Sequence, residues 1–460
     1  MYDNTIGISG GNSTKISVQC QQVILNSIRK LLPDSMIEQT CKEVGYAFRR
    51  RKITPVITVL HMIMAAVWPE EPFNASWQVL WGTCVSWFPQ LSGKCPTRAR
   101  VSEARARLPL PLWRRLFEQL SMQAQKFSQT YDKWRGHRII LTDGTCVSMS
   151  DKPELVEAFG VNTGYHGRAR YPLARLVTVC LAGTMTIIDY AIGGYRDGEP
   201  KLLFGLLESL RKGDLLIADR HFAAAHYYTR YKSAGLEFLT RAHQCLKISK
   251  IKRQFSYSAD DFIGRLNINK VYRRKDSSLP ASINVRLIKA TMRVRGQHRG
   301  VWFVTSLLDA KCYPAAEIVE LYGRRWRVET LFREVKINLS TDVLRSRTPD
   351  GIRKEIIARL TALNIVRSVM LEAALTAGIA DPLRISFTHA VRAIISFSPA
   401  LSQLRLWAAL EVYEAMLIEI ASHINPSRPN RLEPRMVRRE QRHYPSLRTT
   451  RAQWRAKHVA

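Results

Sequence analysis

Features that mark several classes of protein are scarce or missing in this chain of 460 residues. Its eight cysteines are scattered without a CxxC pair or a Cys/His cluster, which argues against a zinc site and a disulfide framework and suits a reducing cytosol. The longest uncharged apolar stretch, residues 53–68, is too short for a membrane span and predicts a buried helix. The N-terminus lacks a basic region followed by an apolar core. We therefore expect no signal peptide and a cytoplasmic, nucleoid-associated protein.

Acidic residues are also scarce. The chain has 38 Asp and Glu against 70 Lys and Arg, a formal net charge of +32. Such an excess favours a polyanionic partner, and binding would depend on salt because each neutralised phosphate releases counterions. Solubility or nonspecific affinity for nucleic acid is the alternative explanation of a basic chain. With 46% hydrophobic residues the chain is no disordered basic tail, and its length allows two to four domains.

The most informative stretch is YGRRWRVETLFREVK, residues 322–336. It carries one acid, two cations and a phenol at offsets 0, 3, 7 and 14: Tyr322, Arg325, Glu329 and Lys336. At roughly 3.6 residues per turn, these offsets fall within about a 60° arc of one helical face. A single helix would therefore present all four side chains on a rigid element, as metal-dependent phosphate chemistry needs.

Two aspartates upstream follow short apolar runs. One run, residues 139–141, leads to Asp143, and the other, residues 215–218, leads to Asp219. Such runs suit buried strands, and an aspartate at the end of a strand lies where open α/β sheets bind their ligands. Together with Glu329, the two aspartates can converge on a pair of divalent cations roughly 3.5–4 Å apart.

The stretch at 322–336 resembles, position for position, the Y-(2)-R-(3)-E-(6)-K signature of the insertion-sequence-four family of bacterial DDE transposases. Asp143 in TDGT and Asp219 in ADRHF resemble the first and second aspartates of that family. The resemblance is strong from about residue 137 to 348 and looser on either side.

This resemblance implies a transposase that binds the terminal inverted repeats of an insertion sequence. Asp143, Asp219 and Glu329 would be the catalytic residues and the ligands of Mg²⁺ or Mn²⁺, and a 3′-hydroxyl freed at the cut end would attack target DNA. The partner would be double-stranded DNA, as transposon ends and as target, with no membrane involved. Because family members commonly pair through C-terminal helices, a homodimer is expected in the synaptic complex. The family is also associated with a hairpin intermediate on the excised end.

Six residues are candidates for contact with DNA: Tyr322, Arg325, Lys336, Trp302, Trp326 and Arg241. The two tryptophans and Arg241 resemble family residues near the DNA, and stacking on a flipped base contributes about 1–3 kcal/mol. Core packing is the alternative for both tryptophans. The two helical cations suit phosphate oxygens, or else form an ion-pair network around Glu329.

Other acids compete with Glu329 for the role of third ligand. Glu334 lies about 120° away around the helix, which disfavours it. Asp189 and Asp214 flank strands and are candidates for caps or for indirect support of the site. Thr145 and His221, next to the two aspartates, are candidates for positioning water or DNA.

The pattern along the chain predicts an α/β protein with a ribonuclease H-like mixed-sheet catalytic core, interrupted by a β-rich insertion and flanked by helical N- and C-terminal regions. The expected regions are a helical DNA-binding region, the first part of the core, the insertion, the second part of the core, and a helical region with a basic tail: 1–130, 131–242, 243–300, 301–376 and 377–460. Core strands and helices should follow a β-β-β-α-β-α order, 137–148, 174–182, 185–192, 200–211, 214–219 and 222–234, with a further strand at 236–241. We expect disorder at 1–15 and an extended or disordered basic tail at 425–460.

Two basic segments allow two interpretations each. A helix that begins near Thr97 carries four arginines, Arg98, Arg100, Arg105 and Arg107, and forms either a solvated face or a contact with transposon-end DNA. The insertion carries eight cations that line a DNA path or form a charged edge against sheet-to-sheet association: Lys250, Lys252, Arg253, Arg273, Arg274, Lys275, Arg293 and Arg295.

Two rival functions remain open. One is a metal-dependent DNA nuclease without strand transfer. The other is a catalytically inactive DNA-binding repressor, whose mark would be a lost acid. All three acids are present with the surrounding spacing, which disfavours the repressor.

Overall fold

The computed structural model describes eleven stretches of the chain: 31–49, 51–67, 77–78, 81, 94–127, 131–164, 167–294, 297–339, 343–403, 406–426 and 456. The chain divides into two units, Met1–Ile424 and Asn425–Ala460, and the architecture below is that of the first. The disorder expected at 1–15 lies outside the described residues. So does the basic tail, except for residues 425, 426 and 456.

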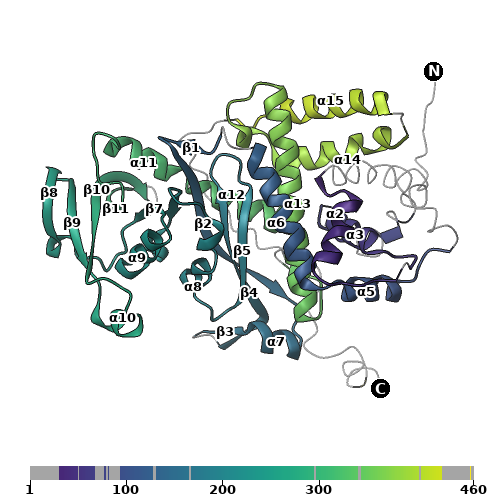
Figure 1. Ribbon diagram of the computed structural model, residues 1–460, viewed down its shortest axis with the longest axis horizontal. Helices are drawn as coiled ribbons and strands as arrows, with labels where there is room; N and C mark the ends of the chain where they lie inside the picture. The colour runs from purple at the N-terminus through teal and green to yellow at the C-terminus, as the bar shows by residue number, and fades with distance from the viewer. Residues whose placement is uncertain are drawn as a thin grey trace. The chain divides into compact units, whose positions relative to one another are not determined.

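A mixed sheet organises the first unit (Figure 1). Its core strands are β2 (His137–Met149), β4 (Gly167–Leu181), β5 (Ile187–Gly194), β6 (Leu215–Ala218) and β7 (Glu237–Arg241). They lie in the order β5-β4-β2-β6-β7, antiparallel from β5 to β2 and parallel from β2 to β7. All the predicted core strands are present, and this ribonuclease H-like core confirms the predicted fold class.

Alternate residues of the core strands pack on opposite faces of the sheet, as a period of two requires. Ile140 and Leu216 pack with α8 (Glu199–Phe204) and α9 (Ala225–Ser233) on one face. Leu141 and Ile217 pack on the other face with helices from both ends of the chain. Because both faces are covered, the strands are continuous apolar runs, which is why the sequence pattern predicted them. The predicted helix at 200–211 is shorter: α8 ends at Phe204 and a 3-10 turn, Leu207–Ser209, follows.

The β-rich insertion continues the same sheet beyond β7. Its strands are β8 (Lys252–Ser258), β9 (Asp261–Asn267), β10 (Ser282–Val294) and β11 (Gln297–Thr305), and β11 pairs antiparallel with β7. The expectation of strands alone is wrong for Lys270–Lys275, which forms α10. There the Asn269 side chain accepts a hydrogen bond from the Val271 N–H and caps the helix. The domain boundaries stated above remain a prediction.

Helices from the two ends of the unit pack together against the sheet (Figure 1). They are α2 (Asp34–Glu43), α3 (Pro55–Val67), α5 (Arg98–Arg107), α6 (Leu110–Phe127), α13 (Pro349–Thr376), α14 (Phe387–Gln403) and α15 (Leu406–Ser422). The buried helix predicted at 53–68 is therefore confirmed as α3, apart from the undescribed Trp68. The sequence of residues 401–423 also favours a single helix, but these residues belong to two: α14 extends to Gln403 and α15 begins at Leu406.

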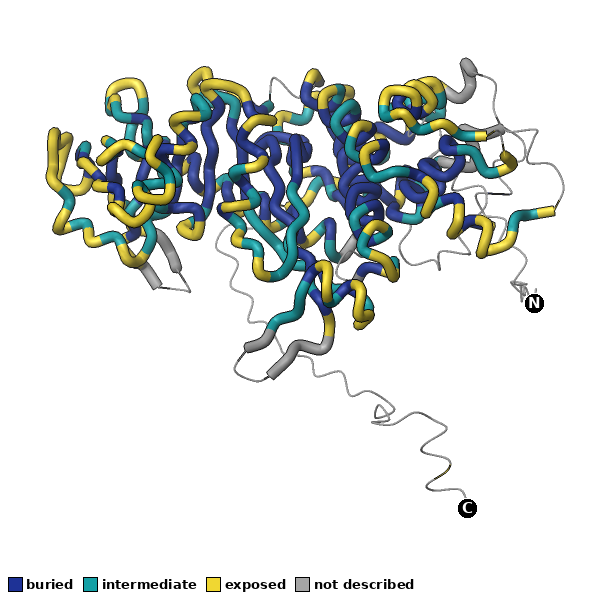
Figure 2. The backbone as a smooth tube through the Cα atoms, turned by 60° about the horizontal axis from the view of Figure 1, so that its bottom comes forward, coloured by how far each residue is buried: buried dark blue, intermediate teal, exposed yellow. Residues whose placement is uncertain are grey.

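Residues 351–376 have the sequence pattern of an amphipathic helix, but α13 is not amphipathic. It contacts α3, α6 and α15, and buried side chains occur all around it. Its polar residues are buried as well, and ion pairs such as Arg359 with Glu355 satisfy them. Figure 2 shows the buried backbone concentrated in the central strands and the helices beside them. None of the described helices combines the length and hydropathy that crossing a bilayer requires.

Candidate active site

The two predicted aspartates lie at the same end of neighbouring parallel strands. Strands β2 and β6 pair Leu141 with Ile217, and each aspartate stands two residues further along its strand. By the two-residue period, Asp143 and Asp219 therefore lie side by side and face the same side of the sheet. Asp219 ends its strand as the N-cap of a 3-10 turn, Arg220–Phe222, where its carboxylate accepts a hydrogen bond from the His221 N–H.

Arg325 joins the third acid to the first. Its Nη2 donates to Glu329 Oε1 at 2.8 Å, and its Nη1 lies 3.7 Å from Asp143 Oδ2. Glu329 projects from α12 (Trp326–Arg333), which packs on the sheet face that carries Leu141. The predicted ion-pair network around Glu329 is present, and it reaches Asp143.

The single helix predicted for 322–336 is wrong. Helix α11 (Ala315–Gly323) ends at Gly323, α12 begins at Trp326, and a π-helical segment, Glu334–Asn338, follows. Glycine is a poor helix former, and a π-turn changes the helical phase, so a uniform period of 3.6 residues fails at both points. Tyr322 and Lys336 therefore stand on elements other than the helix of Glu329.

Tyr322 nevertheless lies within the electrostatic reach of the acids. Its side chain is buried, and burial raises the pKa of the phenol to about 12. The charges of Asp219 and Asp143 raise the pKa of Tyr322 as well, while those of Arg325 and Arg241 lower it. The structure thus brings Tyr322 and Arg241 to the acids. Lys336 is half-buried in the π-helical segment.

The acids carry more negative charge than the protein neutralises. Burial raises the pKa of Asp143 to about 6, although the Gly144 N–H and the Arg325 guanidinium act in the opposite direction. Burial by itself would lower the pKa of Arg325, but the neighbouring Tyr322, Glu329 and Asp143 raise it above its ordinary value. A further cation at this end of the sheet would therefore stabilise ionised Asp143.

The donor set fits a hard divalent cation, because three carboxylates offer the oxygen ligands that Mg²⁺ and Mn²⁺ prefer. Asp143, Asp219 and Glu329 are not all within 4.8 Å of one another, and Arg325 lies between two of them. The Glu329 side chain is 47% exposed, so it is free to approach a cation held by the aspartates.

Comparison with known proteins identifies the family of this chain. The family described as Transposase DDE domain matches residues 134–365, half of the chain. The chain belongs to this family of DDE transposases. It is also 25% identical, over 360 residues, to a transposase named InsG for insertion sequence element IS4 from Escherichia coli strain K12. That alignment covers 76% of this chain and 77% of the relative, and it supports the resemblance to the insertion-sequence-four family.

One solved structure is also similar to this DDE transposase. It is a cryo-EM structure of the piggyBac transposase synaptic complex with hairpin DNA, 11% identical in sequence, with a TM-score of 0.42. The match covers 89% of this chain and 86% of that one. At this level of similarity it bears neither on the fold nor on the function.

The two candidate tryptophans of the transposase have different surroundings. Trp326 is 55% exposed, so core packing is the wrong explanation for it, and the Arg325 guanidinium lies 4.5 Å from the centroid of its ring. Trp302 is half-buried on β11, and its ring meets that of Phe262 edge-on at 5.8 Å. Core packing therefore describes the contacts of Trp302, while the ring of Trp326 is mostly exposed and lies against Arg325.

The competing acids lie in ion pairs elsewhere in the transposase. Asp189 pairs with Arg114 at 2.6 Å, and Asp214 pairs with Arg138 at 2.6 Å. Glu334 pairs with Arg367 of α13. None of these contacts involves the three predicted catalytic acids.

Glu199 is an acid near the site that the sequence pattern did not reveal. It opens α8, and a Cβ on Gly144 would lie only 2.4 Å from its Cδ, so the carboxylate rests directly on the residue after Asp143. Its charge contributes to the raised pKa of Asp143, and Arg175 lies 3.5 Å from it. Only the fold brings a residue 56 positions along the chain from Asp143 to this place, and no local spacing signals it.

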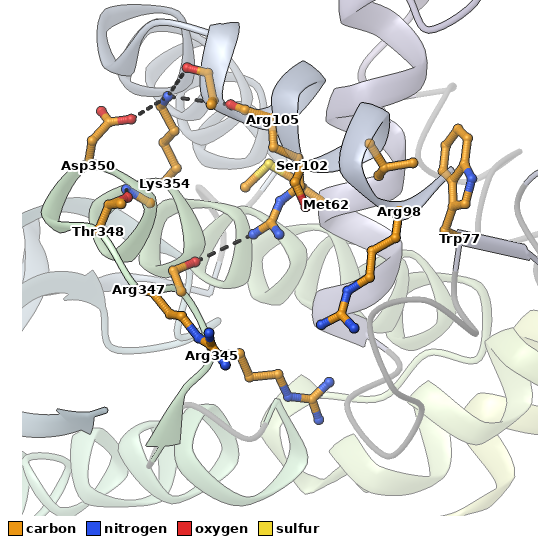
Figure 3. Close-up of a pocket in the computed structure, with 14 residues that line it drawn as sticks. Met62, Trp77, Arg98, Ser102, Arg105, Arg345, Arg347, Thr348, Asp350 and Lys354 are labelled. Carbon is orange, nitrogen blue, oxygen red and sulfur yellow. Dashed lines mark hydrogen bonds and ion pairs between the residues drawn. The ribbon is translucent and has the colours of Figure 1, made fainter. Parts of the chain in front are cut away.

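A basic pocket of about 710 Å³ lies between α5 and the N-terminal end of α13 (Figure 3). Arg98 extends from α5, and Arg345 and Arg347 extend from the segment before α13, toward the same open space. The floor of the pocket is tied together by hydrogen bonds from Arg105 to Ser346 and from Lys354 to the α5 backbone. The α5 arginine face thus has a tertiary partner, which the sequence pattern of α5 alone did not indicate.

Proposed function

We propose that this DDE transposase binds the terminal inverted repeats of an insertion sequence, cuts the DNA at those ends, and joins the freed 3′-hydroxyl to target DNA. The observation that carries the proposal is that Asp143 and Asp219 lie side by side at one end of strands β2 and β6, while Arg325 links Glu329 to Asp143. The relative from Escherichia coli, named as a transposase for an insertion sequence element, supports this substrate.

Asp143, Asp219 and Glu329 would hold Mg²⁺ or Mn²⁺ through carboxylate oxygens. When bound, the metal would supply the positive charge that activates a nucleophilic hydroxyl and stabilises the leaving oxygen. The protein's own contribution is to hold the three acids on a sheet and a packed helix, so that their positions are set before DNA arrives.

The neighbouring side chains suit the DNA strand at the cut. Arg325 offers a planar fork to a phosphate once its carboxylate partners engage a metal. Trp326 presents an exposed ring on which an extruded base can stack. Arg241 and Lys336 add positive charge for phosphate oxygens. The buried Tyr322 side chain would support the site from the protein interior, where it interacts with the charges around it. Trp302 is the weaker candidate for base stacking because its ring packs against Phe262.

DNA outside the cut would follow the exposed cations. The pocket with Arg98, Arg345 and Arg347 has the size and charge to take a phosphate backbone. Its arginines read charge and not base sequence, so they would position DNA without selecting it. The basic insertion would add a second stretch of contact.

We also propose that the transposase acts as a homodimer through its C-terminal helices. Leu410 and Ile418, eight residues apart on α15, lie on one side of the helix and are 57% and 63% exposed. Large apolar side chains exposed together mark a surface that a partner covers. Sedimentation of Ile418→Asp with and without end DNA would test this surface.

The test of the proposed function uses DNA that carries the gene with its flanking sequence on both sides, a target plasmid and Mg²⁺. Cutting at the outer ends of inverted repeats and joining of the 3′ ends to the plasmid are expected, and EDTA should stop both. Cutting without any joining would identify a nuclease, and binding without cutting would identify a repressor. Either result would overturn the proposal. DNA with its terminal base pairs changed serves as the control.

A further inference from the structure

A second set of metal-ligand side chains lies where α14 begins and α15 ends. His389 is in the first turn of α14, Glu419 is in the last turn of α15, and His423 follows α15 directly. The two helices lie side by side (Figure 1). Among the described residues, these three are the group whose His, Cys, Asp or Glu ligand atoms all lie within 4.8 Å of one another.

The contacts within this His/Glu/His cluster all meet at one carboxylate. His389 Nε2 lies 3.2 Å from Glu419 Oε1, and His423 Nδ1 lies 3.7 Å from the same oxygen. The two imidazole rings stack with their centroids 3.3 Å apart and their planes 14° apart. The Glu419 carboxylate therefore lies near both imidazoles, while His423 Nδ1 is closer to Ser422 Oγ, at 2.9 Å, and to the Glu419 carbonyl oxygen, at 3.4 Å.

The chemistry of these ligands selects a kind of metal. Two imidazole nitrogens and one carboxylate oxygen suit Zn²⁺ and related transition metals, whereas Mg²⁺ prefers oxygen ligands alone. Zn–N bonds of about 2.0–2.1 Å place tetrahedral ligand atoms roughly 3.3 Å apart. The ligand atoms already lie near that spacing, but the two imidazole rings must turn out of their stack before both nitrogens can point at one metal. The side chains of Glu419 and His423 are 42% and 50% exposed, which leaves room for that rotation.

The surrounding backbone gives such a metal a structural purpose. The Ser386 N–H donates to the His423 carbonyl, and Ile385 forms a β-bridge with Ile424. These bonds and the cluster hold the start of α14 against the end of α15. A metal bound by ligands from both helices would tie the same two chain segments together. The scattered cysteines argue against a thiolate zinc site, but they do not bear on a site built from histidine and glutamate.

We propose that His389, Glu419 and His423 form a Zn²⁺-type site that joins α14 to α15, separate from the acids of the sheet. Three protein ligands would leave one position for water. The site is independent of the proposed DNA chemistry.

The test is titration of the full-length, metal-stripped protein with Zn²⁺ in the presence of excess Mg²⁺, which occupies carboxylate sites. The wild type is expected to bind one equivalent of Zn²⁺ that His389→Gln and Glu419→Gln bind more than about 100-fold more weakly. Even a partner of a metal ligand is worth roughly 10–100-fold in affinity. Co²⁺ in place of Zn²⁺ should give a visible absorption band in the wild type and not in the two variants.

Glu414→Gln is the matched control, because Glu414 is an exposed acid on α15 outside the cluster. It should bind Zn²⁺ as the wild type does. Added Zn²⁺ should raise the melting temperatures of the wild type and Glu414→Gln above the values that they have in EDTA, and should not raise those of His389→Gln and Glu419→Gln. Equal Zn²⁺ binding by the wild type and His389→Gln would overturn the proposal. So would a Zn²⁺-dependent rise in melting temperature that both share.

Discussion

The acids at the end of β2 and β6 and the basic pocket between α5 and α13 handle charge in opposite ways. At the acid site, Asp143 and Arg325 are largely buried, and Arg325 contacts both Asp143 and Glu329. In the pocket, Arg98, Arg345 and Arg347 are exposed around a volume of about 710 Å³. Buried charges interact strongly and depend on exact placement, whereas exposed charges interact weakly and nearly additively.

This difference assigns separate tasks to the two regions. Substitutions at the acid site should act on cleavage through geometry, with little effect on DNA affinity. Substitutions in the pocket should act on affinity through the number of charges, whatever the DNA sequence. Each prediction below tests one side of that division.

Glu329→Gln is expected to have the largest effect. Glutamine keeps the size of the side chain but removes the charge that would hold a divalent cation, so Mg²⁺-dependent cleavage should fall by roughly 10³-fold or more. Binding of end DNA should stay near the wild-type level, as a gel-shift assay would measure. Glu320→Gln, an exposed acid on α11, is the control and should cleave normally. Unimpaired cleavage by Glu329→Gln would remove Glu329 from the site.

Arg325→Lys tests whether cleavage requires a guanidinium that contacts two acids at once. The guanidinium reaches Glu329 and Asp143 with two different nitrogens, and a single ammonium cannot do both. Single-turnover cleavage should fall by up to about 10²-fold, because misplacement of a catalytic group by about 1 Å costs that much. Arg333→Lys, at an exposed arginine of the same helix, is the control. A wild-type rate for Arg325→Lys would show that Arg325 supplies only charge.

Asp143→Asn should stabilise the metal-free protein while it abolishes cleavage. Burial raises the pKa of Asp143 to about 6 in the folded state, against roughly 3.9 in the unfolded chain. The stability that protonated Asp143 contributes is fully present below about pH 4 and is lost as the pH rises through about 6. In EDTA at pH 7.5 the variant should therefore gain on the order of 2 kcal/mol in urea unfolding.

The same gain should shrink as the pH falls toward 4, because Asp143 then becomes protonated in the folded wild type. A gain that is independent of pH would mean that packing, and not the charge of Asp143, limits stability at this end of the sheet.

Features that depend on neighbouring residues in the sequence were predictable, whereas features that depend on contacts between distant segments were not. The strands carrying Asp143 and Asp219 were predictable because both faces of the sheet are covered, which leaves continuous apolar runs. The single helix at 322–336 was not, since a uniform period of 3.6 residues takes no account of the break at Gly323 or of the π-helical segment. The four-residue signature still identified Glu329, because the spacing of the signature indicates the family even where the helix is broken.

Residues that reach a site only through the fold escaped prediction. Glu199 lies against Gly144, and Arg345 and Arg347 share a pocket with Arg98, across separations that no periodicity records. The burial of helix α13 on all sides could not be predicted for a related reason. Its buried polar residues, among them Arg359 and its partner Glu355, look in sequence like the solvent face of an amphipathic helix.

Arg347→Gln is expected to have the smallest effect and tests the pocket side of the comparison. If the Arg347 guanidinium neutralises one phosphate, its loss should lower the steepness of log K against log salt by about 0.9 and weaken binding alike for end DNA and unrelated DNA. Lys212→Gln is the matched control, since Lys212 is an exposed cation before the start of β6, at the opposite end of the strand from Asp219. It should leave the slope unchanged. A loss of affinity confined to end DNA would instead mean that Arg347 reads bases. The basic pocket would then depend on exact placement as the acid site does, and the contrast between the two regions would fail.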